Sequence, residues 1–226
     1  MLERKIPRSN IYVRQRGRLT QSQARALEQH ASEYLLEPGD KNIDMQQVFG
    51  NASAPTLEIG FGVGQALIEM ATKHPERNYL GIEVYLPGIG ALIHRCHVLD
   101  IHNVRVIRGD AKHVLEFNCI EESLAQVNVF FPDPWPKRKH LKRRIIQSPM
   151  IELIRQRLVP KGRVCLATDW EAYAHWMLEK FSQTPGLTNL SLDDTFTERL
   201  EERPLTRFEA RGIRLGHEVW DLCFQK

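Results

Sequence analysis

The chain has 226 residues, of which 42% are hydrophobic and 26% are charged. This length suits one domain with a full core, and the composition is ordinary for a soluble globular protein. The formal net charge of +3 is too small to indicate nucleic-acid binding by itself, so such an argument depends on where the charges lie.

Neither secretion nor membrane insertion is indicated. No apolar run reaches about 18 residues, and the N-terminus carries no apolar signal core. The four cysteines form no C-x-x-C pair, which is typical of reduced, mostly buried thiols rather than a zinc site or disulfides: Cys96, Cys119, Cys165 and Cys223. We therefore expect a cytoplasmic protein.

The N-terminal quarter differs from the rest. Residues 1–18 carry six basic side chains against one acid, and Thr20 then caps a helical pattern that ends near Leu35. Residues 37–55 are rich in turn formers. The sequence predicts a basic arm, a helix and a linker over 1–50, followed by the main domain over 51–226.

From residue 56 onward, strand and helix signals alternate. Strands are predicted at 56–60, 78–83, 104–109, 127–131, 162–168 and 217–224, and helices at 63–73, 86–99, 111–117, 147–158 and 170–182. Repeated βα units predict an α/β fold, a Rossmann-like doubly wound and mostly parallel sheet with an antiparallel C-terminal strand. Ligands of such sheets bind at the carboxyl ends of the strands.

A glycine turn follows the first strand of this domain. Glu58 precedes Gly60, Gly62 and Gly64 in the pattern G-x-G-x-G, whereas a dinucleotide fingerprint requires G-x-G-x-x-G. The pattern looks like the first motif of class I methyltransferases, which bind S-adenosylmethionine. Acidic groups can bind the ammonium and the ribose diol of that cofactor. The turn alone is a weak signal.

Two further acids end the next two strands. Glu83 lies at the offset where an acid binds ribose hydroxyls in doubly wound folds, and Asp110 could face the adenine. A solvated carboxylate is the alternative for Glu83, and a helix N-cap is the alternative for Asp110. Three acids at successive strand ends favour a cofactor site.

The most informative stretch is 127–144. A buried strand ends at a rigid corner, Pro132-Asp133-Pro134-Trp135-Pro136, and six of the next eight residues are basic. Each half alone has an ordinary explanation, since proline turns and solvated charge runs are common. Together they indicate chemistry on a polyanion.

At this point the sequence strongly resembles the bacterial tRNA (guanine-N7)-methyltransferases, and the resemblance runs nearly end to end. The segments that carry it are 13–20, the glycine turn, 131–144, 167–170, 206–209 and 216–222. The resemblance implies S-adenosylmethionine as cofactor, tRNA as substrate, a variable-loop guanosine as target, and no obligate protein partner.

The resemblance also implies roles for single residues. Cofactor contacts fall on Glu58, the three glycines of the turn, Glu83, Asp110 and Asp133, and Asp133 is catalytic. Substrate-binding positions are Lys137, Asp169, Thr206, Arg207, Phe208 and Glu209. RNA-binding positions are Lys139, His140, Leu141, Lys142, Arg143 and Arg144.

The chemistry of the target can be argued beside the resemblance. N7 of guanine carries no proton, so methyl transfer requires in-line placement rather than deprotonation. Asp133 could stabilise the positive charge that develops on the base, or hold the N1–H and N2–H₂ edge; general-base catalysis is the weaker hypothesis. Trp135 could stack on the base or only pack in the corner.

Some expectations remain open at the level of sequence. Residues 206–209 could form a surface loop with an Arg-Glu pair of little energetic weight, and Asp169 could be only a helix cap. The histidines show no ligand spacing, and no metal is indicated. The alternatives in function are a small-molecule methyltransferase, which gives no use for the basic strips, and an RNA-binding protein with an inactive core, which the intact motifs oppose.

Overall fold

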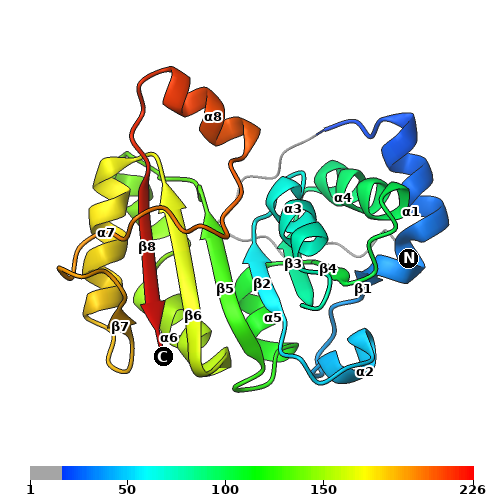
Figure 1. Ribbon diagram of the computed structural model, residues 1–226, viewed down its shortest axis with the longest axis horizontal. Coiled ribbons are helices and arrows are strands. Elements are labelled where there is room, and N and C mark those ends of the chain that lie inside the picture. Colours follow the sequence, from blue (N-terminus) through cyan, green and yellow to red (C-terminus); the bar gives the residue numbers. More distant parts are fainter. Residues whose placement is uncertain (1–16) are drawn as a thin grey trace.

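A computed structural model describes residues 17–226, apart from the side chains of residues 207 and 208. The basic arm expected over 1–18 therefore lies outside the described residues, except for Gly17 and Arg18. Within the described part, the predicted α/β fold is confirmed (Figure 1).

Eight strands of this part form one sheet in the order β1-β4-β3-β2-β5-β6-β8-β7. The strands are β1 (Leu35–Leu36), β2 (Thr56–Ile59), β3 (Tyr79–Glu83), β4 (Val104–Arg108), β5 (Leu124–Phe130), β6 (Leu158–Thr168), β7 (Thr188–Asn189) and β8 (Trp220–Gln225). Pairing is parallel from β1 to β6 and antiparallel at β8 and β7. The chain moves from β2 outward to β4 and resumes at β5 on the other side of β2, so the order of the strands reverses between the parallel neighbours β2 and β5.

Helices cover both faces of the sheet. They are α1 (Gln21–Tyr34), α2 (Met45–Phe49), α3 (Gln65–Lys73), α4 (Leu86–Val98), α5 (Ala111–Phe117), α6 (Ser148–Arg157), α7 (Glu171–Ser182), α8 (Arg207–Arg214) and the 3-10 helix η1 (Arg138–Arg143). Helices α1, α3 and α4 bury their apolar sides on one face, and α5, α6 and α7 on the other. Figure 1 shows α8 apart from both layers, at the end where the parallel strands point.

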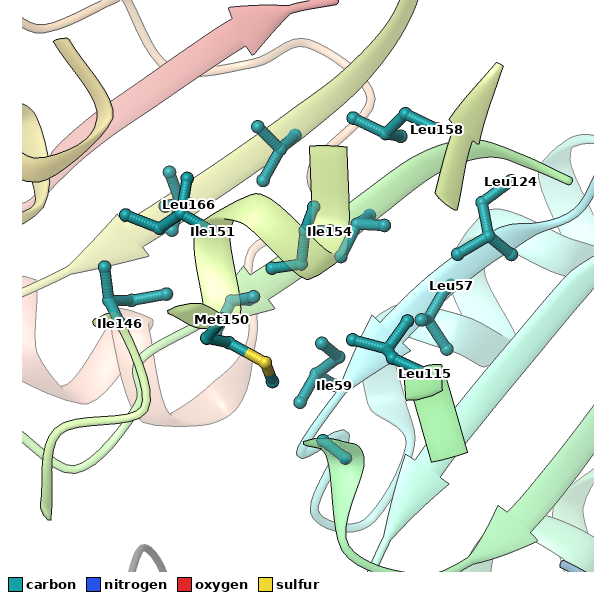
Figure 2. Packing of buried hydrophobic residues seen from close by; sticks show 14 of the residues in the cluster. Leu57, Ile59, Leu115, Leu124, Ile146, Met150, Ile151, Ile154, Leu158 and Leu166 are labelled. Atoms are coloured by element: carbon teal, nitrogen blue, oxygen red, sulfur yellow. The ribbon is translucent and has the colours of Figure 1, made fainter. Parts of the chain in front are cut away.

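The core has two parts, one on each face. Figure 2 shows the larger one, where Ile151 and Ile154 of α6 and Leu115 of α5 lie against the strands of the sheet. These side chains are fully buried, and such close packing fixes the strands whose ends form the site. All four cysteines are buried free thiols, as the sequence predicted.

The described part of the N-terminal segment shares the sheet and the core. Helix α1 begins with the expected cap, a capping box in which Thr20 accepts from the backbone N–H of Gln23. Its Leu27 is buried in the same cluster as Ile89 and Ile93 of α4, and β1 pairs with β4 at the sheet edge. The boundary predicted at residue 50 therefore marks a change in composition. Contacts of α1 with α4 and of β1 with β4 join the two sides of it.

The short elements α2, β1 and β7 were not predicted from the sequence, and two longer segments also differ from expectation. Residues 207–214 form helix α8, where no helix was expected, and the basic strip forms the 3-10 helix η1. Helix α8 is capped by Thr206, which accepts from the backbone N–H of Glu209. Only eight residues long, it shows too few turns for an apolar period to be read. No helix among the described residues has the length and apolar character needed to span a membrane.

Candidate active site

A pocket of about 280 Å³ opens at the carboxyl ends of the central strands. Its walls come from the ends of β2, β3, β4 and β5 and from the proline corner, including Gly60, Gly62, Glu83, Asp110 and Asp133. The pocket thus lies across the point where the strand order reverses, between β2 and β5, which is where ligands of doubly wound sheets bind. With Trp135, which also lines the pocket, the structure therefore brings together six of the residues singled out from the sequence.

The glycine turn shapes one wall. Gly62 has a φ of +58°, and a Cβ built on it would meet no atom within 4 Å, so the backbone there is open to a close ligand. Gly64 has a different task, because a Cβ there would lie 2.4 Å from Leu92 Cδ1 of α4. Gly64 is absent from the pocket wall and allows α3 and α4 to pack closely.

Glu83 holds this turn in place. Its Oε2 accepts from Gly62 N at 2.8 Å, and its Oε1 accepts from Val84 N at 2.7 Å and from Tyr85 N at 3.0 Å. A carboxylate has about four acceptor positions, so roughly one remains for a ligand. The side chain is 9% exposed and lines the pocket. Sequence reasoning found the residue but not its second task of fixing the turn.

Glu58 lies behind the pocket wall rather than in it. Its side chain is 4% exposed, and its Oε2 has no hydrogen-bond partner among the described residues. Burial, and then the nearby Glu83 carboxylate, raise the pKa of Glu58 from its ordinary 4.5 to about 8. A buried acid without a cation suits a site that receives positive charge from a ligand. The residues present therefore fit a cationic cofactor such as S-adenosylmethionine.

Asp110 combines both roles considered for it. Its Oδ1 accepts from His113 N at 3.1 Å and so caps α5. The residue also lines the pocket. Since the cap uses one of the two carboxylate oxygens, the other is available to a ligand.

The proline corner closes the opposite side. Phe131 and Trp135 both have left-handed backbones, with φ of 50° and 42°, on either side of the exposed Asp133. Such backbone strain persists only where the surroundings hold it, often at functional sites. Asp133 makes no hydrogen bond or ion pair within the described residues, and no metal-binding group of three His, Cys, Asp or Glu occurs there.

Trp135 both lines the pocket and packs in the corner. The Arg143 guanidinium lies 4.9 Å from its ring centroid, and the His140 ring meets it edge-on at 5.6 Å. Its Nε1 is buried without a partner among the described residues. The two roles expected from the sequence are thus compatible.

The basic strip divides into exposed and buried members. Lys137, Lys139 and Lys142 are exposed, whereas His140, Leu141 and Arg143 are half-buried. The electropositive neighbours of His140 contribute, after its partial burial, to lowering its pKa. The strip therefore presents at least three free ammonium groups beside the pocket.

Arg144 does not fit the RNA contact expected for it. It is 4% exposed, its Nε donates to Pro134 O at 2.8 Å, and its guanidinium lies 4.6 Å from the Tyr173 ring and 5.0 Å from the Trp176 ring. Burial lowers its pKa. Its charge is used to anchor the proline corner on α7, so it is not available to a phosphate.

The expected substrate-binding residues lie near the pocket but outside its wall. Asp169 follows β6, and its Oδ2 lies 3.6 Å from His217 Nδ1. Thr206 caps α8. Glu209 is 2% exposed and buried against arginines. The side chains of Arg207 and Phe208 lie outside what the structure describes. Lys137 is exposed at the start of the basic strip.

Sequence reasoning missed Arg203. This residue, 2% exposed, forms bidentate pairs with both Glu209 and Asp221. A single arginine between two glutamates and a proline carries no motif, so no signal in the sequence could have found it.

The family described as "Putative methyltransferase" matches residues 53–222. A tRNA (guanine-N(7)-)-methyltransferase of Pseudomonas putida is 47% identical over 219 residues, covering 97% of this chain and 91% of the relative. Its counterpart in Shewanella piezotolerans is 49% identical over 215 residues, covering 95% and 91%.

Solved structures share the fold at low identity. The 16S rRNA methyltransferase KamB has a TM-score of 0.61 and 14% identity, covering 82% of this chain and 94% of its own. A Streptococcus mutans protein described as a "putative methyltransferase", in complex with SAH, has a TM-score of 0.50 and 13% identity, covering 77% and 89%. At such identities these two structures speak for the class I methyltransferase fold alone.

Proposed function

The chain belongs to the tRNA (guanine-N7)-methyltransferase family, and from that premise we propose its function: transfer of a methyl group from S-adenosylmethionine to N7 of a guanosine in tRNA, giving 7-methylguanosine. The observation that carries this assignment to the site is the pocket at the strand ends. Carboxylates of Glu83 and Asp110 line one side of it, and Asp133, shortly before the basic strip in the sequence, lines the other. Because the proposed substrate is tRNA, we also propose that the protein acts in the cytoplasm.

The acid side of the pocket would hold the cofactor, which supplies an electrophilic methyl group on a sulfonium. Glu83 has an acceptor position left for a ribose hydroxyl, and Asp110 has a free carboxylate oxygen beside it. Glu58 would stabilise the cofactor's positive charge from behind the wall, by proximity rather than by a hydrogen bond through it. The glycine turn lets the backbone approach the cofactor closely.

Asp133 would act on the base. Because N7 has a lone pair and no proton, the reaction needs alignment of N7 with the methyl group and stabilisation of the charge that forms on the guanine. Asp133 lies exposed on the pocket wall with no partner in the described residues, so its carboxylate can serve either purpose. We assign it positioning and charge stabilisation, with no proton to remove.

The strip and the neighbouring loops would bind the RNA. Lys137, Lys139, Lys142 and Arg143 lie where phosphates can reach them, and Asp169 and residues 206–208 lie at the same end of the sheet. We expect a guanosine of the variable loop, as the family resemblance implies.

Mass spectrometry of nucleosides tests the proposed function. Unmodified tRNA incubated with the protein and S-adenosylmethionine should yield 7-methylguanosine. A methyl group on another atom or base would contradict the assignment. No transfer, with tRNA still bound, would favour the RNA-binding protein with an inactive core. Transfer to small acceptors alone would favour a small-molecule methyltransferase.

A further inference from the structure

Four charged side chains form a compact group beside the pocket, which we call the Arg203 cluster: Arg199, Arg203, Glu209 and Asp221. Arg203 donates to Glu209 through Nη1 at 2.6 Å and Nη2 at 2.7 Å, and to Asp221 through Nε at 2.7 Å and Nη2 at 2.8 Å. Arg199 reaches Glu209 Oε1 at 3.4 Å from the solvent side. The two carboxylates are thus balanced by two guanidiniums, and the three inner residues are almost fully buried.

The cluster joins three parts of the chain at this end of the sheet, namely β8, α8 and the segment that leads into α8. Asp221 belongs to β8, whose strand pairs with β6, and Glu209 belongs to the first turn of α8. The Arg203 guanidinium also lies 5.8 Å from the ring centroid of Phe130 and 5.6 Å from that of Phe131. Both phenylalanines line the pocket, and Phe131 begins the corner that carries Asp133.

The segment leading into α8 runs over the sheet toward the glycine turn. Figure 1 shows this segment crossing in front of β8, β6 and β5 before it turns up into α8. Thr197 bridges to Asp221 of β8, and Leu205 O accepts from Gln65 Nε2, at the start of α3, at 3.5 Å. Arg203 therefore lies at the middle of a strap whose far end carries Thr206 and α8 to the pocket.

We propose that Arg203 is a positioning residue for methyl transfer, which fixes both α8 and the Phe131–Asp133 corner relative to the pocket. In this account, which rests on the proposed function, Glu209 acts through Arg203 and not by contact with substrate. Arg203 touches neither substrate nor cofactor. Its effect reaches the reaction through the placement of Asp133 on one side and of residues 206–208 on the other.

The chemistry of the cluster favours positioning over simple stabilisation. A buried ion pair gains little stability over well-packed apolar side chains, because desolvation offsets the Coulomb attraction. What an arginine provides is a planar fork that holds two carboxylates in fixed directions. A flat guanidinium also stacks on aromatic rings, as it does on Phe130 and Phe131. Fixed orientation at a pocket edge is what alignment of a methyl donor and acceptor requires.

Arg203→Lys is the first test, because it keeps the charge and loses the fork. We expect an unchanged affinity for S-adenosylmethionine by calorimetry and a single-turnover methyl-transfer rate, at saturating tRNA, slower by on the order of tenfold to a hundredfold. Arg155→Lys is the matched control, since Arg155 forms a bidentate pair with Glu152 on the surface of α6, away from the pocket. It should leave both quantities unchanged.

Asp221→Asn covers the case in which Arg203→Lys does not fold. It keeps the shape of the β8 arm and removes its charge, and Asp221 is absent from the pocket wall. We expect the same separation of cofactor affinity from rate. A wild-type rate in a folded Arg203→Lys, or in Asp221→Asn if the former does not fold, would overturn the proposal.

Hydrogen exchange separates a failure of this inference from a failure of the proposed function. With no substrate present, the backbone amides of residues 206–215 should exchange faster in the Arg203→Lys or Asp221→Asn protein than in the wild type. Those of β2 and β3 should not change. If residues 206–215 exchange faster in the variants but neither the wild type nor the variants transfer a methyl group, the proposed function is refuted. The role of Arg203 in holding α8 would then still stand. Unchanged exchange of residues 206–215 would refute the role of Arg203 in holding α8.

Discussion

Glu58 and Glu209 are both buried glutamates at the same end of the sheet, exposed by 4% and 2%, and they differ in the charge that faces them. Glu209 pairs with Arg203 and Arg199. Glu58 has another acid, Glu83, as its charged neighbour and an oxygen without a partner among the described residues. The charge of Glu209 is balanced by arginines, and that of Glu58 is not balanced by any described residue.

The difference teaches which acids are structural and which await a ligand. A buried charge without a partner is unfavourable, so its pKa shifts until it is neutral or a cation arrives. Among the described residues neither Glu58 nor Glu83 forms an ion pair with a basic side chain, which suits a cofactor that brings its own charge. The charges of the Arg203 cluster pair with one another without a ligand, which suits a structural link between α8 and the sheet.

The largest expected effect is on the rate of methyl transfer when Asp133, the exposed acid on the pocket wall, is changed. Asp133→Asn keeps the shape and removes the charge, so single-turnover methyl transfer should fall by on the order of 10²–10³. Asp100→Asn, on an exposed turn after α4, is the control and should be neutral. Because N7 carries no proton, the solvent deuterium isotope effect on the chemical step should be near unity. A large normal effect with binding saturated would instead indicate general-base catalysis.

Stability should depend on pH through Glu58. Its pKa is raised from 4.5 to about 8, so the folded protein keeps a proton that the unfolded chain releases between these values. The folded state then binds more protons, and the free energy of unfolding falls as pH rises through this window. Glu58→Gln should remove that fall. The free energy of unfolding of the variant should therefore rise relative to that of the wild type by a few kcal/mol from pH 5 to pH 8.

Urea denaturation at several pH values measures this. The difference between wild type and Glu58→Gln cancels the other titrating groups. A difference that stays constant from pH 5 to pH 8 would show that Glu58 ionises normally.

Cofactor affinity should respond to Glu83. Glu83→Ala removes an acceptor for the ribose diol and the three backbone hydrogen bonds that hold the glycine turn. Calorimetric titration with S-adenosylmethionine should show a loss of about 1.5–3 kcal/mol, roughly tenfold or more. Wild-type affinity in a folded variant would end the assignment of Glu83 to the cofactor.

The smallest effect per residue belongs to the basic strip. Changing Lys139, Lys142 and Arg143 to Ala should flatten the salt dependence of tRNA binding by up to about 0.9 log units per lost phosphate contact. Arg144 is left in place, because it is buried in the corner. The control changes Lys73, Lys161 and Arg163, which are exposed near the amino ends of the strands. An equal salt slope in both triple variants would make the strip an ordinary solvated face.

The sequence predicted the sheet and the acids at its strand ends because both depend on local patterns. Alternating βα units fix where strands end, so Glu83 and Asp110 could be placed without coordinates. Arg203 could not, since its partners lie 6 and 18 residues away on different elements. Arg144 was assigned to RNA because a charge run does not reveal which member turns inward. Burial of single charges depends on packing between distant segments.

The central claim, that an unbalanced acid behind the pocket wall favours a cationic cofactor, is tested by proton release on binding. S-adenosylmethionine is titrated calorimetrically at pH 7 in buffers of different ionisation enthalpy, with wild type and Glu58→Gln. The pKa of Glu58 is about 8, so the carboxyl is mostly protonated at this pH, and a cation should drive its proton off. We predict that the wild type releases more protons per bound cofactor than Glu58→Gln. Equal proton counts in the two proteins would contradict the account.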